Sequence, residues 1–583
     1  MKRWLEYVKP YKLYFILGPV CMLVEVAGEV MMPMFLGKII NAGIYGTLTV
    51  SKSIGYALLM VLTALMMMAG GVGGAYFGAK ASVNYASDVR RDVYSKVQKF
   101  SFANIDKFST ASLVTRLTND ITQIQNFINM LLRMCMRSPG IFIGALLMAI
   151  SLRPSLSVIF AVTIPIVAAT IAIVIKIGFP RFTRMQTKVD ALNSTVQENV
   201  TNVRVVKSFV REGFEIDKFE KANGDLKQSG ISAMKVMILI GPFMTLFMNI
   251  TTAVVVWIGA KLVMADGAGA MPPGDLSQFI SYVNQILMSL MMLTMLFVMS
   301  SRALASSRRI SEVLDEKVDI SDAGAAYPEL KVNKGEIEFK DVSFRYYKNS
   351  QDSVLDHISL KIEPGSVVGI IGSTGCGKTT LVSLIPRLYD ADEGEILVDG
   401  VNVRDYNLKK LRDGVGTVLQ KNVLFSGTIE DNLRWGDENA SDEEVVKAAK
   451  SAQADSFVSS FSDGYKTELE QGGVNVSGGQ KQRLCIARAL LKKPKILILD
   501  DSTSAVDTAT EAKIREQFRT GLKDSTKIII AQRITSVMDA DKIVVMNDGK
   551  ITGIGTHDEL LASNEEYKEI YYSQMERAEK KEA

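Results

Sequence analysis

The sequence predicts an all-α membrane domain of six helices followed by an α/β domain, and three observations lead to this fold class. The chain has 583 residues, more than one hydrophobic core organises. Hydrophobic residues make up 48% of it and gather before about residue 305. After residue 335, short apolar runs alternate with helix-like segments. The predicted parts are a membrane domain over 1–315, a linker over 316–334, an α/β domain over 335–575 and a charged tail over 576–583.

Six stretches are mostly apolar over the roughly 20 residues that a helix needs to cross a bilayer. They cover 14–40, 55–79, 128–151, 155–178, 234–263 and 277–300. The segments after the first, third and fifth stretches are short, and the last of these, Ala265–Gly274, has the Gly and Pro content of a turn. We therefore expect a multi-pass protein of the cell membrane, in contact with the lipid bilayer.

The two remaining gaps, about 80–127 and 179–233, are long, helix-periodic and rich in Lys and Arg. Because cytoplasmic loops carry an excess of these residues, we expect both gaps, the N-terminus and everything after the sixth span in the cytoplasm. The helical pattern continues from the spans into the gaps. This predicts helices that project beyond the membrane and turn near Phe102–Phe108 and near Gly213–Phe219.

Small and charged residues inside the spans mark helix contacts. Three glycines recur every four residues along the second span: Gly70, Gly74 and Gly78. This spacing favours close helix packing. Glu25 and Glu29 share one face of the first span, and Arg133 and Arg137 share one face of the third. Charges at membrane depth face one another or a cavity, so ion pairing and a substrate pathway both remain open for these four residues.

The α/β part contains a complete phosphate-binding motif. An apolar strand, Ser366–Ile371, runs into G-x-x-x-x-G-K-T, the pattern of a P-loop. Backbone N–H groups of such a loop surround phosphates, and the next helix adds its positive end. Lys378 would reach the β- and γ-phosphates, and the Thr379 hydroxyl would hold Mg²⁺. The predicted phosphate loop consists of Gly372, Ser373, Thr374, Gly375, Cys376, Gly377, Lys378, Thr379 and Thr380.

A second apolar run, Ile496–Leu499, ends in Asp500 and Asp501. Asp500 can contact Mg²⁺ through water, so the two motifs together predict a P-loop NTPase fold with ATP and Mg²⁺ as cofactors. A formal net charge of +4 gives no case for a nucleic-acid partner. The four cysteines form no C-x-x-C pair, so we expect neither a disulfide framework nor a cysteine metal site.

The run Val476-Ser-Gly-Gly-Gln480-Lys-Gln-Arg483 resembles the signature motif of the ATP-binding-cassette (ABC) family, and six spans before one cassette are the layout of a half-size ABC exporter. The resemblance implies that Tyr346 stacks on adenine and that Gln420 joins Thr379 and Asp500 around Mg²⁺. It also implies that Asp507 communicates across a dimer and that the two cytoplasmic turns are coupling helices. Four signature residues would serve the ATP held by an opposite subunit: Ser477, Gly478, Gly479 and Gln480.

Two catalytic positions depart from the family pattern. Asp501 stands where the family has a glutamate that polarises the attacking water, and its side chain is one methylene shorter. Gln532, in the switch loop Ala531-Gln532-Arg533, stands where the family has a histidine, and an amide cannot carry a proton or a positive charge. Both departures predict a degenerate site that binds ATP and hydrolyses it poorly. Such a chain resembles the degenerate-site subunit of heterodimeric bacterial multidrug exporters.

The resemblance thus implies one subunit of an ATP-driven exporter that moves drugs, lipids or peptides by alternating access. Its partner would be a second half-transporter, a different chain with Glu and His at the two catalytic positions. Two alternatives stay open: a homodimeric exporter with slow ATP hydrolysis, and an ATP-gated channel or regulatory membrane subunit. The six spans argue against a soluble ABC protein acting on nucleic acid.

Overall fold

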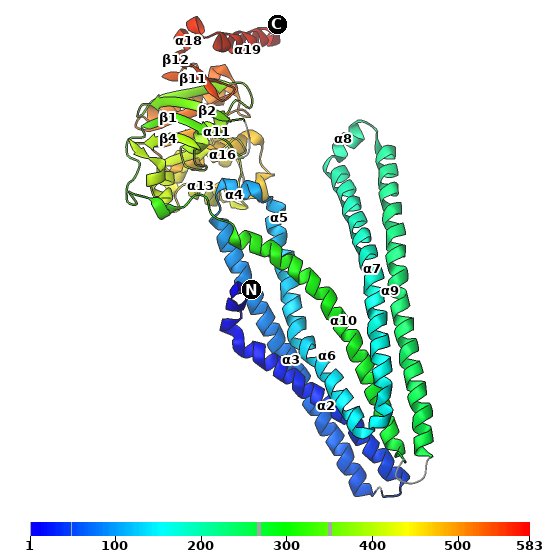
Figure 1. Ribbon diagram of the computed structural model, residues 1–583. Coiled ribbons are helices and arrows are strands. Elements are labelled where there is room, and N and C mark those ends of the chain that lie inside the picture. The colour runs from blue at the N-terminus through cyan, green and yellow to red at the C-terminus, as the bar shows by residue number, and fades with distance from the viewer. Residues whose placement is uncertain (1, 48, 265–269, 348–351, 583) are drawn as a thin grey trace. The chain divides into compact units, whose positions relative to one another are not determined.

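The computed structural model describes residues 2–47, 49–264, 270–347 and 352–582 (Figure 1). The chain divides into two compact units. The first comprises Met1–Gln98 and Thr110–Asp315, and the second comprises Lys99–Ser109 and Glu316–Ala583. The short segment Lys99–Ser109 therefore belongs with the C-terminal unit although helices of the first unit flank it in sequence.

The first unit is entirely helical in its described residues. Its elements are α1 Lys2–Glu6, η1 Lys9–Tyr11, α2 Lys12–Ile44, α3 Val50–Gln98, α5 Thr110–Thr115, the π-helical η2 Arg116–Asp120, α6 Ile121–Leu152, α7 Pro154–Thr201, α8 Val203–Ser208, α9 Glu212–Val263 and α10 Pro273–Asp315. Among the described residues, five helices are long and apolar enough to cross a membrane. The sixth predicted span, 277–300, falls in α10, where the side chains of 293–299 lie outside the described part. So do residues 265–269 of the predicted turn.

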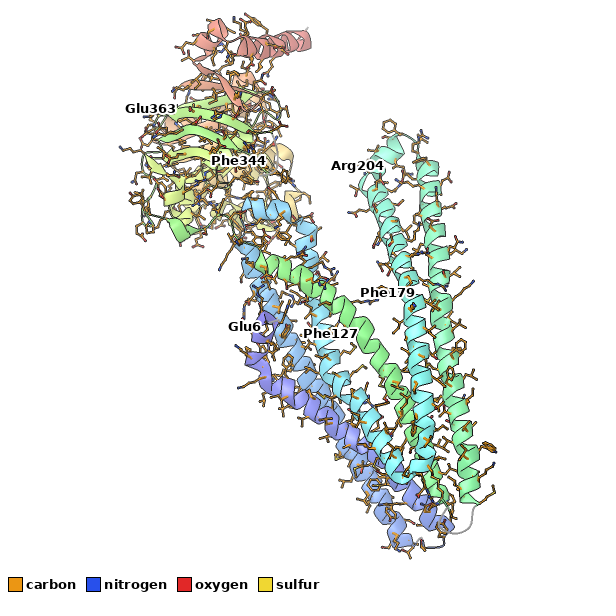
Figure 2. All side chains as sticks on the ribbon, viewed as in Figure 1. Glu6, Phe127, Phe179, Arg204, Phe344 and Glu363 are labelled. Carbon is orange, nitrogen blue, oxygen red and sulfur yellow. The ribbon has the colours of Figure 1, made fainter. Side chains whose placement is uncertain are left out.

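The helices continue well past the predicted spans. Helices α3, α7 and α9 have 49, 48 and 52 residues. At about 1.5 Å per residue each is roughly 70 Å or longer, more than twice the roughly 30 Å of a hydrocarbon core. The predicted continuation of the helices past the spans is therefore confirmed. Phe179, in the middle part of α7, is 68% exposed (Figure 2).

The second predicted turn was misplaced. Gly213–Phe219 lies in the first turns of α9, and the chain reverses earlier, through α8 between Asn202 and Arg211. Figure 1 shows α7 and α9 side by side with α8 joining their ends. The reversal contains neither Gly nor Pro, and Val210 adopts the left-handed conformation (φ 52°) that glycine usually supplies. Sequence patterns had instead favoured Gly213.

Close packing of α2 on α3 confirms the role predicted for the glycine face. A Cβ atom on Gly70 would lie 2.8 Å from the Cys21 carbonyl oxygen of α2. Only a residue without a side chain allows this approach. Elsewhere in the unit, Phe160 of α7 stacks on Phe279 of α10 with ring centroids 5.6 Å apart.

In the residues that the structure describes, the second unit combines three sheets with short helices. Its strands are β1 Ile337–Phe344, β2 Leu355–Ile362, β3 Val367–Gly372, β4 Glu393–Val398, β5 Val401–Asn402, β6 Val415–Val418, β7 Gly427–Thr428, β8 Glu468–Leu469, β9 Ile496–Asp500, β10 Thr526–Ile530, β11 Lys542–Asn547 and β12 Lys550–Gly555. Its α-helices are α4 Phe102–Lys107, α11 Lys378–Leu384, α12 Leu408–Asp413, α13 Ile429–Arg434, α14 Asp442–Ser451, α15 Asp455–Val458, α16 Gly478–Leu491, α17 Thr508–Gly521, α18 His557–Ser563 and α19 Glu565–Glu582.

The six-stranded sheet positions the site. Its order is β12-β11-β3-β10-β9-β6, and the pairs β11–β3, β3–β10, β10–β9 and β9–β6 are parallel. All five residues of β9 are buried, as expected for a strand covered on both faces. Because parallel strands end at the same edge, the segments after β3, β10, β9 and β6 meet there. A separate four-stranded sheet, β2-β1-β4-β5, is antiparallel.

The first predicted turn becomes helix α4, which is attached to the α/β fold within the second unit. Ser101 caps the helix, and the Asn104 side chain donates to the Lys317 carbonyl at 2.9 Å. The Tyr389 hydroxyl donates to Asp106 at 2.8 Å, and its ring lies 5.9 Å from that of Phe102. The turn and the α/β fold thus share both polar and aromatic contacts.

Candidate nucleotide-binding site

The phosphate loop connects β3 to α11, in the strand–loop–helix arrangement that the motif requires. A Cβ atom on Gly372 would lie 2.0 Å from the Met546 carbonyl oxygen, and Gly377 has a φ of 94°, so both positions need glycine. The Lys378 ammonium group donates to the carbonyl oxygens of Gly372 at 2.9 Å and Ser373 at 2.7 Å. The lysine is therefore held over the loop that would surround phosphates.

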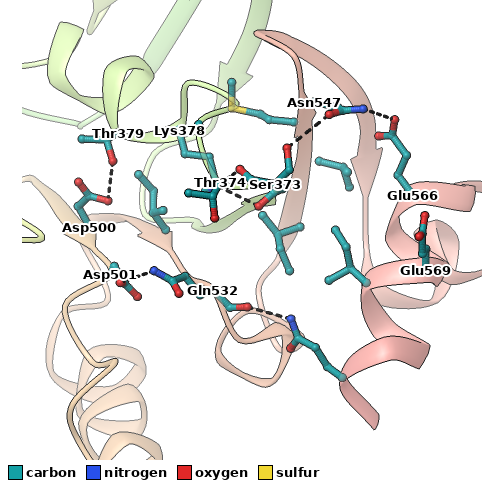
Figure 3. Close-up of a pocket in the computed structure, with 18 of the residues that line it drawn as sticks. Ser373, Thr374, Lys378, Thr379, Asp500, Asp501, Gln532, Asn547, Glu566 and Glu569 are labelled. Carbon is teal, nitrogen blue, oxygen red and sulfur yellow. Dashed lines mark hydrogen bonds between the residues drawn. The ribbon is translucent and has the colours of Figure 1, made fainter. Parts of the chain in front are cut away.

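A cavity of about 630 Å³ opens at the shared strand edge (Figure 3). Sequence-predicted residues that line it are Gly372, Ser373, Thr374, Gly375, Lys378, Thr379, Gln420, Asp500, Asp501 and Gln532. They come from the last residues of β3 and β9 and from the segments after β3, β6, β9 and β10, which are distant in sequence. The structure thus brings the phosphate loop, the acidic pair and the switch loop together around one space.

The chain supplies oxygen atoms suited to Mg²⁺ in this cavity. The Thr379 hydroxyl donates to Asp500 Oδ1 at 3.1 Å, and the Gln420 side chain lines the same space. Mg²⁺ is usually held by one or two carboxylates together with waters and substrate phosphates, so this sparse set fits the ion. Burial raises the pKa of Asp500, and the nearby charge of Asp501 raises it further. A bound cation would offset both effects.

Asp501 and Gln532 are neighbours in the lining of the cavity, and the Gln532 amide donates to Asp501 Oδ2 at 2.7 Å (Figure 3). Burial raises the pKa of Asp501, while hydrogen bonds from Gln420 and Gln532 and the charge of Lys378 partly oppose this effect. The Asp501 backbone is left-handed (φ 47°), a region that Asp enters more readily than most residues. The two departures from the family pattern thus form one hydrogen-bonded pair.

Tyr346 does not line the cavity. Its hydroxyl shares a 2.8 Å hydrogen bond with Thr380 Oγ1, and its ring lies 5.2 Å from that of Tyr389. Cys376 is buried within the loop. Tyr346 therefore contacts α11, the helix that follows the phosphate loop, and through Tyr389 it is linked to α4.

The signature residues are also absent from the lining of this cavity. Ser477 caps α16, where its hydroxyl accepts from the Gln480 N–H and the Gln480 side chain accepts from the Ser477 N–H at 2.9 Å. Gly479 lies against the Ala505 backbone, where a Cβ atom would be 2.7 Å from the carbonyl oxygen. Gly478 is exposed, and Asp507 caps α17. The structure thus places the signature at an exposed helix N-terminus, apart from the phosphate loop.

Sequence reasoning missed one side of the cavity. The C-terminal helix α19 contributes Glu566, Glu569, Ile570, Ser573 and Gln574 to the lining. No motif marks this helix. Its only sequence signal is the helical spacing of apolar residues that pack on the sheet, and this spacing does not reveal which site they would border.

The intramembrane charges form an ion cluster in the first unit. One Arg137 nitrogen lies 3.4 Å from Glu25 Oε1 and 3.2 Å from Glu29 Oε2. Arg133 is exposed, and its Cγ lies near Gly78. Pairing, one of the two interpretations left open by the sequence, is therefore observed for three of the four residues.

Comparison with known proteins divides the chain into the same two parts as the sequence analysis, an N-terminal membrane part and a C-terminal α/β part. Residues 15–290 match the family described as the ABC transporter transmembrane region, and residues 355–504 match the ABC transporter family. The chain is 39% identical to the uncharacterized ABC transporter ATP-binding protein YfiB of Bacillus subtilis over 99% of each chain. It is 36% identical to MT1311 of Mycobacterium tuberculosis, over 98% of this chain and 97% of that protein. A solved bacterial Atm1-family ABC exporter with ATP bound superposes with a TM-score of 0.78 at 26% identity, over 97% and 98% of the two chains.

Proposed function

Because this chain belongs to the ABC transporter family and carries the transmembrane region and the ATP-binding cassette in one polypeptide, we propose that it is one subunit of a heterodimeric exporter. Its own site holds ATP and hydrolyses it slowly. The cargo is amphipathic, a drug, lipid or peptide, and moves out of the cytoplasm by alternating access. The cassette and the N-terminus lie on the cytoplasmic side, as the distribution of Lys and Arg indicates.

The hydrogen-bonded pair of Asp501 and Gln532 carries the proposal. Hydrolysis needs a group that positions the attacking water, and a misplacement of about 1 Å can cost about a hundredfold in rate. The Asp501 carboxylate is set back by one methylene, and Gln532 cannot transfer a proton. The phosphate loop, Lys378 and Thr379 retain the groups needed for binding. The site therefore supports retention of ATP with slow hydrolysis.

The exposed signature supports a partner chain. Helix α16 has 14 residues, and its N-terminal N–H groups attract anions. Ser477 and Gly478 are exposed at this end, where the ATP of a second cassette could reach them. The turn around α8 also exposes large apolar side chains, with Phe209 73% and Val210 80% exposed. Burying these exposed apolar side chains would favour association with a partner chain. The cassette of that partner is the surface that would bury them.

The proposal is tested by purifying the full chain alone and with candidate half-transporters that carry Glu and His at the two catalytic positions. We expect the lone chain to bind MgATP with slow turnover, and the correct pair to hydrolyse ATP briskly. Brisk hydrolysis by the lone chain that Asp501→Asn abolishes would contradict the degenerate site. ATP-dependent accumulation of cargo in inside-out vesicles would distinguish an exporter from an ATP-gated channel.

A further inference from the structure

We propose that Gln574 of α19 is a positioning residue that clamps the switch loop so that Gln532 meets Asp501. The Ile534 N–H donates to Gln574 Oε1 at 2.8 Å, and Gln574 Nε2 donates to the Gln532 carbonyl oxygen at 2.9 Å. One planar amide thus pairs with two backbone groups, one on each side of Arg533. Figure 3 shows the bond between Gln532 and Asp501 that this arrangement would hold in place.

Helix α19 is anchored firmly enough to act as a clamp. Tyr567 is fully buried and packs in one core with the fully buried Ile534. Its hydroxyl shares a 2.7 Å hydrogen bond with His557. Gln574 follows Tyr567 by seven residues, about two helical turns, so the two side chains lie on the same face of the helix. The core that fixes Tyr567 therefore also fixes Gln574 beside the loop.

A second anchor ties α19 to the strand beside the phosphate loop. The Asn547 amide donates to Glu566 Oε1 at 2.9 Å. Asn547 ends β11, which pairs with β3. The helix is thus attached at Glu566 to the sheet edge and at Gln574 to the switch loop, and both residues line the cavity.

The clamp acts through Gln532. The Gln532 amide donates to the Asp501 carboxylate at 2.7 Å. Fixing the carbonyl group of Gln532 limits the backbone rotations that would carry its side chain away from Asp501. The effect on turnover rests on the proposed function, since it requires ATP as the ligand of the cavity. The clamp itself does not.

Three variants of the full chain test this inference: Gln574→Ala, Gln574→Glu and the control Tyr572→Ala. The first removes both hydrogen bonds. The second keeps an acceptor for the Ile534 N–H and loses the donor to Gln532, because a carboxylate only accepts. Tyr572 lies on the same helix and is 56% exposed, so the control tests whether altering α19 is enough by itself.

The first measurement is hydrogen exchange at Ile534 in the nucleotide-free chain. We expect exchange to be about tenfold faster in Gln574→Ala, which corresponds to the loss of one hydrogen bond. In the other two variants, the exchange rate should stay within about twofold of that of the original chain. Unchanged exchange in Gln574→Ala would overturn the clamp. So would equal acceleration in Tyr572→Ala.

The second measurement is single-turnover hydrolysis with protein in excess over ATP, together with MgATP affinity. Both Gln574 variants should lower the hydrolysis rate by about tenfold and leave affinity within about twofold, whereas Tyr572→Ala should change neither. Equal loss of affinity and rate would indicate a purely structural role and overturn the positioning role. A chain that binds no ATP would contradict the proposed function, and the exchange data alone would then decide the clamp.

Discussion

The Gln532 amide donates a hydrogen bond of 2.7 Å to the Asp501 carboxylate, so two residues 31 positions apart in sequence form one structural unit. Residues in direct contact rarely act additively when they are changed. The two departures from the family pattern are therefore expected to behave as a coupled pair. In the function proposed above, the distinction between holding ATP and hydrolysing it depends on this pair.

Restoring the family residues should restore hydrolysis. Asp501→Glu returns the missing methylene, and Gln532→His returns a group that can carry a proton. We expect the double variant to hydrolyse ATP about a hundredfold faster than the original chain, and by more than the product of the two single changes. Steady-state hydrolysis by the purified chain measures this. A double variant whose gain equals the product of the two single gains would contradict coupling.

The half-buried charge of Asp501 should cost stability at neutral pH. Burial raises the pKa of Asp501, so the folded chain binds this proton more tightly than the unfolded chain does. Stability contributed by the protonated group is present at low pH and is lost as pH rises through the raised pKa. Asp501→Asn never acquires the charge. Its melting temperature should exceed that of the original chain by about 1–2 °C at pH 7.5, and the difference should shrink towards pH 4.5.

Changing the signature should affect the partner's site and spare this chain's own. A Cβ atom on Gly478 would lie 3.7 Å from Ala505 Cβ, so a side chain fits there. Gly478→Asp would place a negative charge where a phosphate of the opposite ATP is expected. We predict at least about a hundredfold loss of hydrolysis by the proposed heterodimer, with ATP affinity of the lone chain unchanged. Gly478→Ala is the uncharged control. Lys378→Ala should give the converse pattern, in which ATP affinity of the lone chain falls and hydrolysis at the partner's site is spared.

Removing the cation of the intramembrane cluster should destabilise the membrane unit. Arg137→Met would leave Glu25 and Glu29 without their counter-ion, at a cost of about 3–5 kcal/mol. The yield of folded protein in detergent should fall, and should recover when both glutamates are also changed to Gln. Arg133→Met should have little effect, because Arg133 is exposed. Full yield from Arg137→Met alone would contradict the structural role.

Tyr389 should affect coupling more than ATP binding. Tyr389→Phe removes the 2.8 Å hydrogen bond to Asp106 and keeps the ring contacts with Tyr346 and Phe102. Losing this hydrogen bond should lower the free energy of unfolding by about 1 kcal/mol. We expect MgATP affinity within about twofold and a lower ratio of cargo moved to ATP hydrolysed in vesicles. An unchanged ratio would show that the contact with α4 only supports the fold.

Much of the fold and part of the site followed from the sequence because their signals are local. The phosphate loop needs only a strand, a run of glycines and a helix that are adjacent along the chain. The long apolar helices likewise follow from residues close together in sequence. Asp501 and Gln532 could be identified because each lies within a recognisable short motif.

Other features depended on strand order and packing. The turn at α8 could not be placed because Val210, without any glycine signal, adopts a left-handed conformation there. The 2.7 Å contact between Asp501 and Gln532 exists because β9 and β10 are neighbours, a pairing that neither motif encodes. Gln574 borders the site only because the buried Tyr567 fixes α19 against the sheet. The sequence by itself determined which chemical groups this protein carries. The tertiary structure decided which of them meet, because residues distant along the chain are brought within hydrogen-bond distance only by packing.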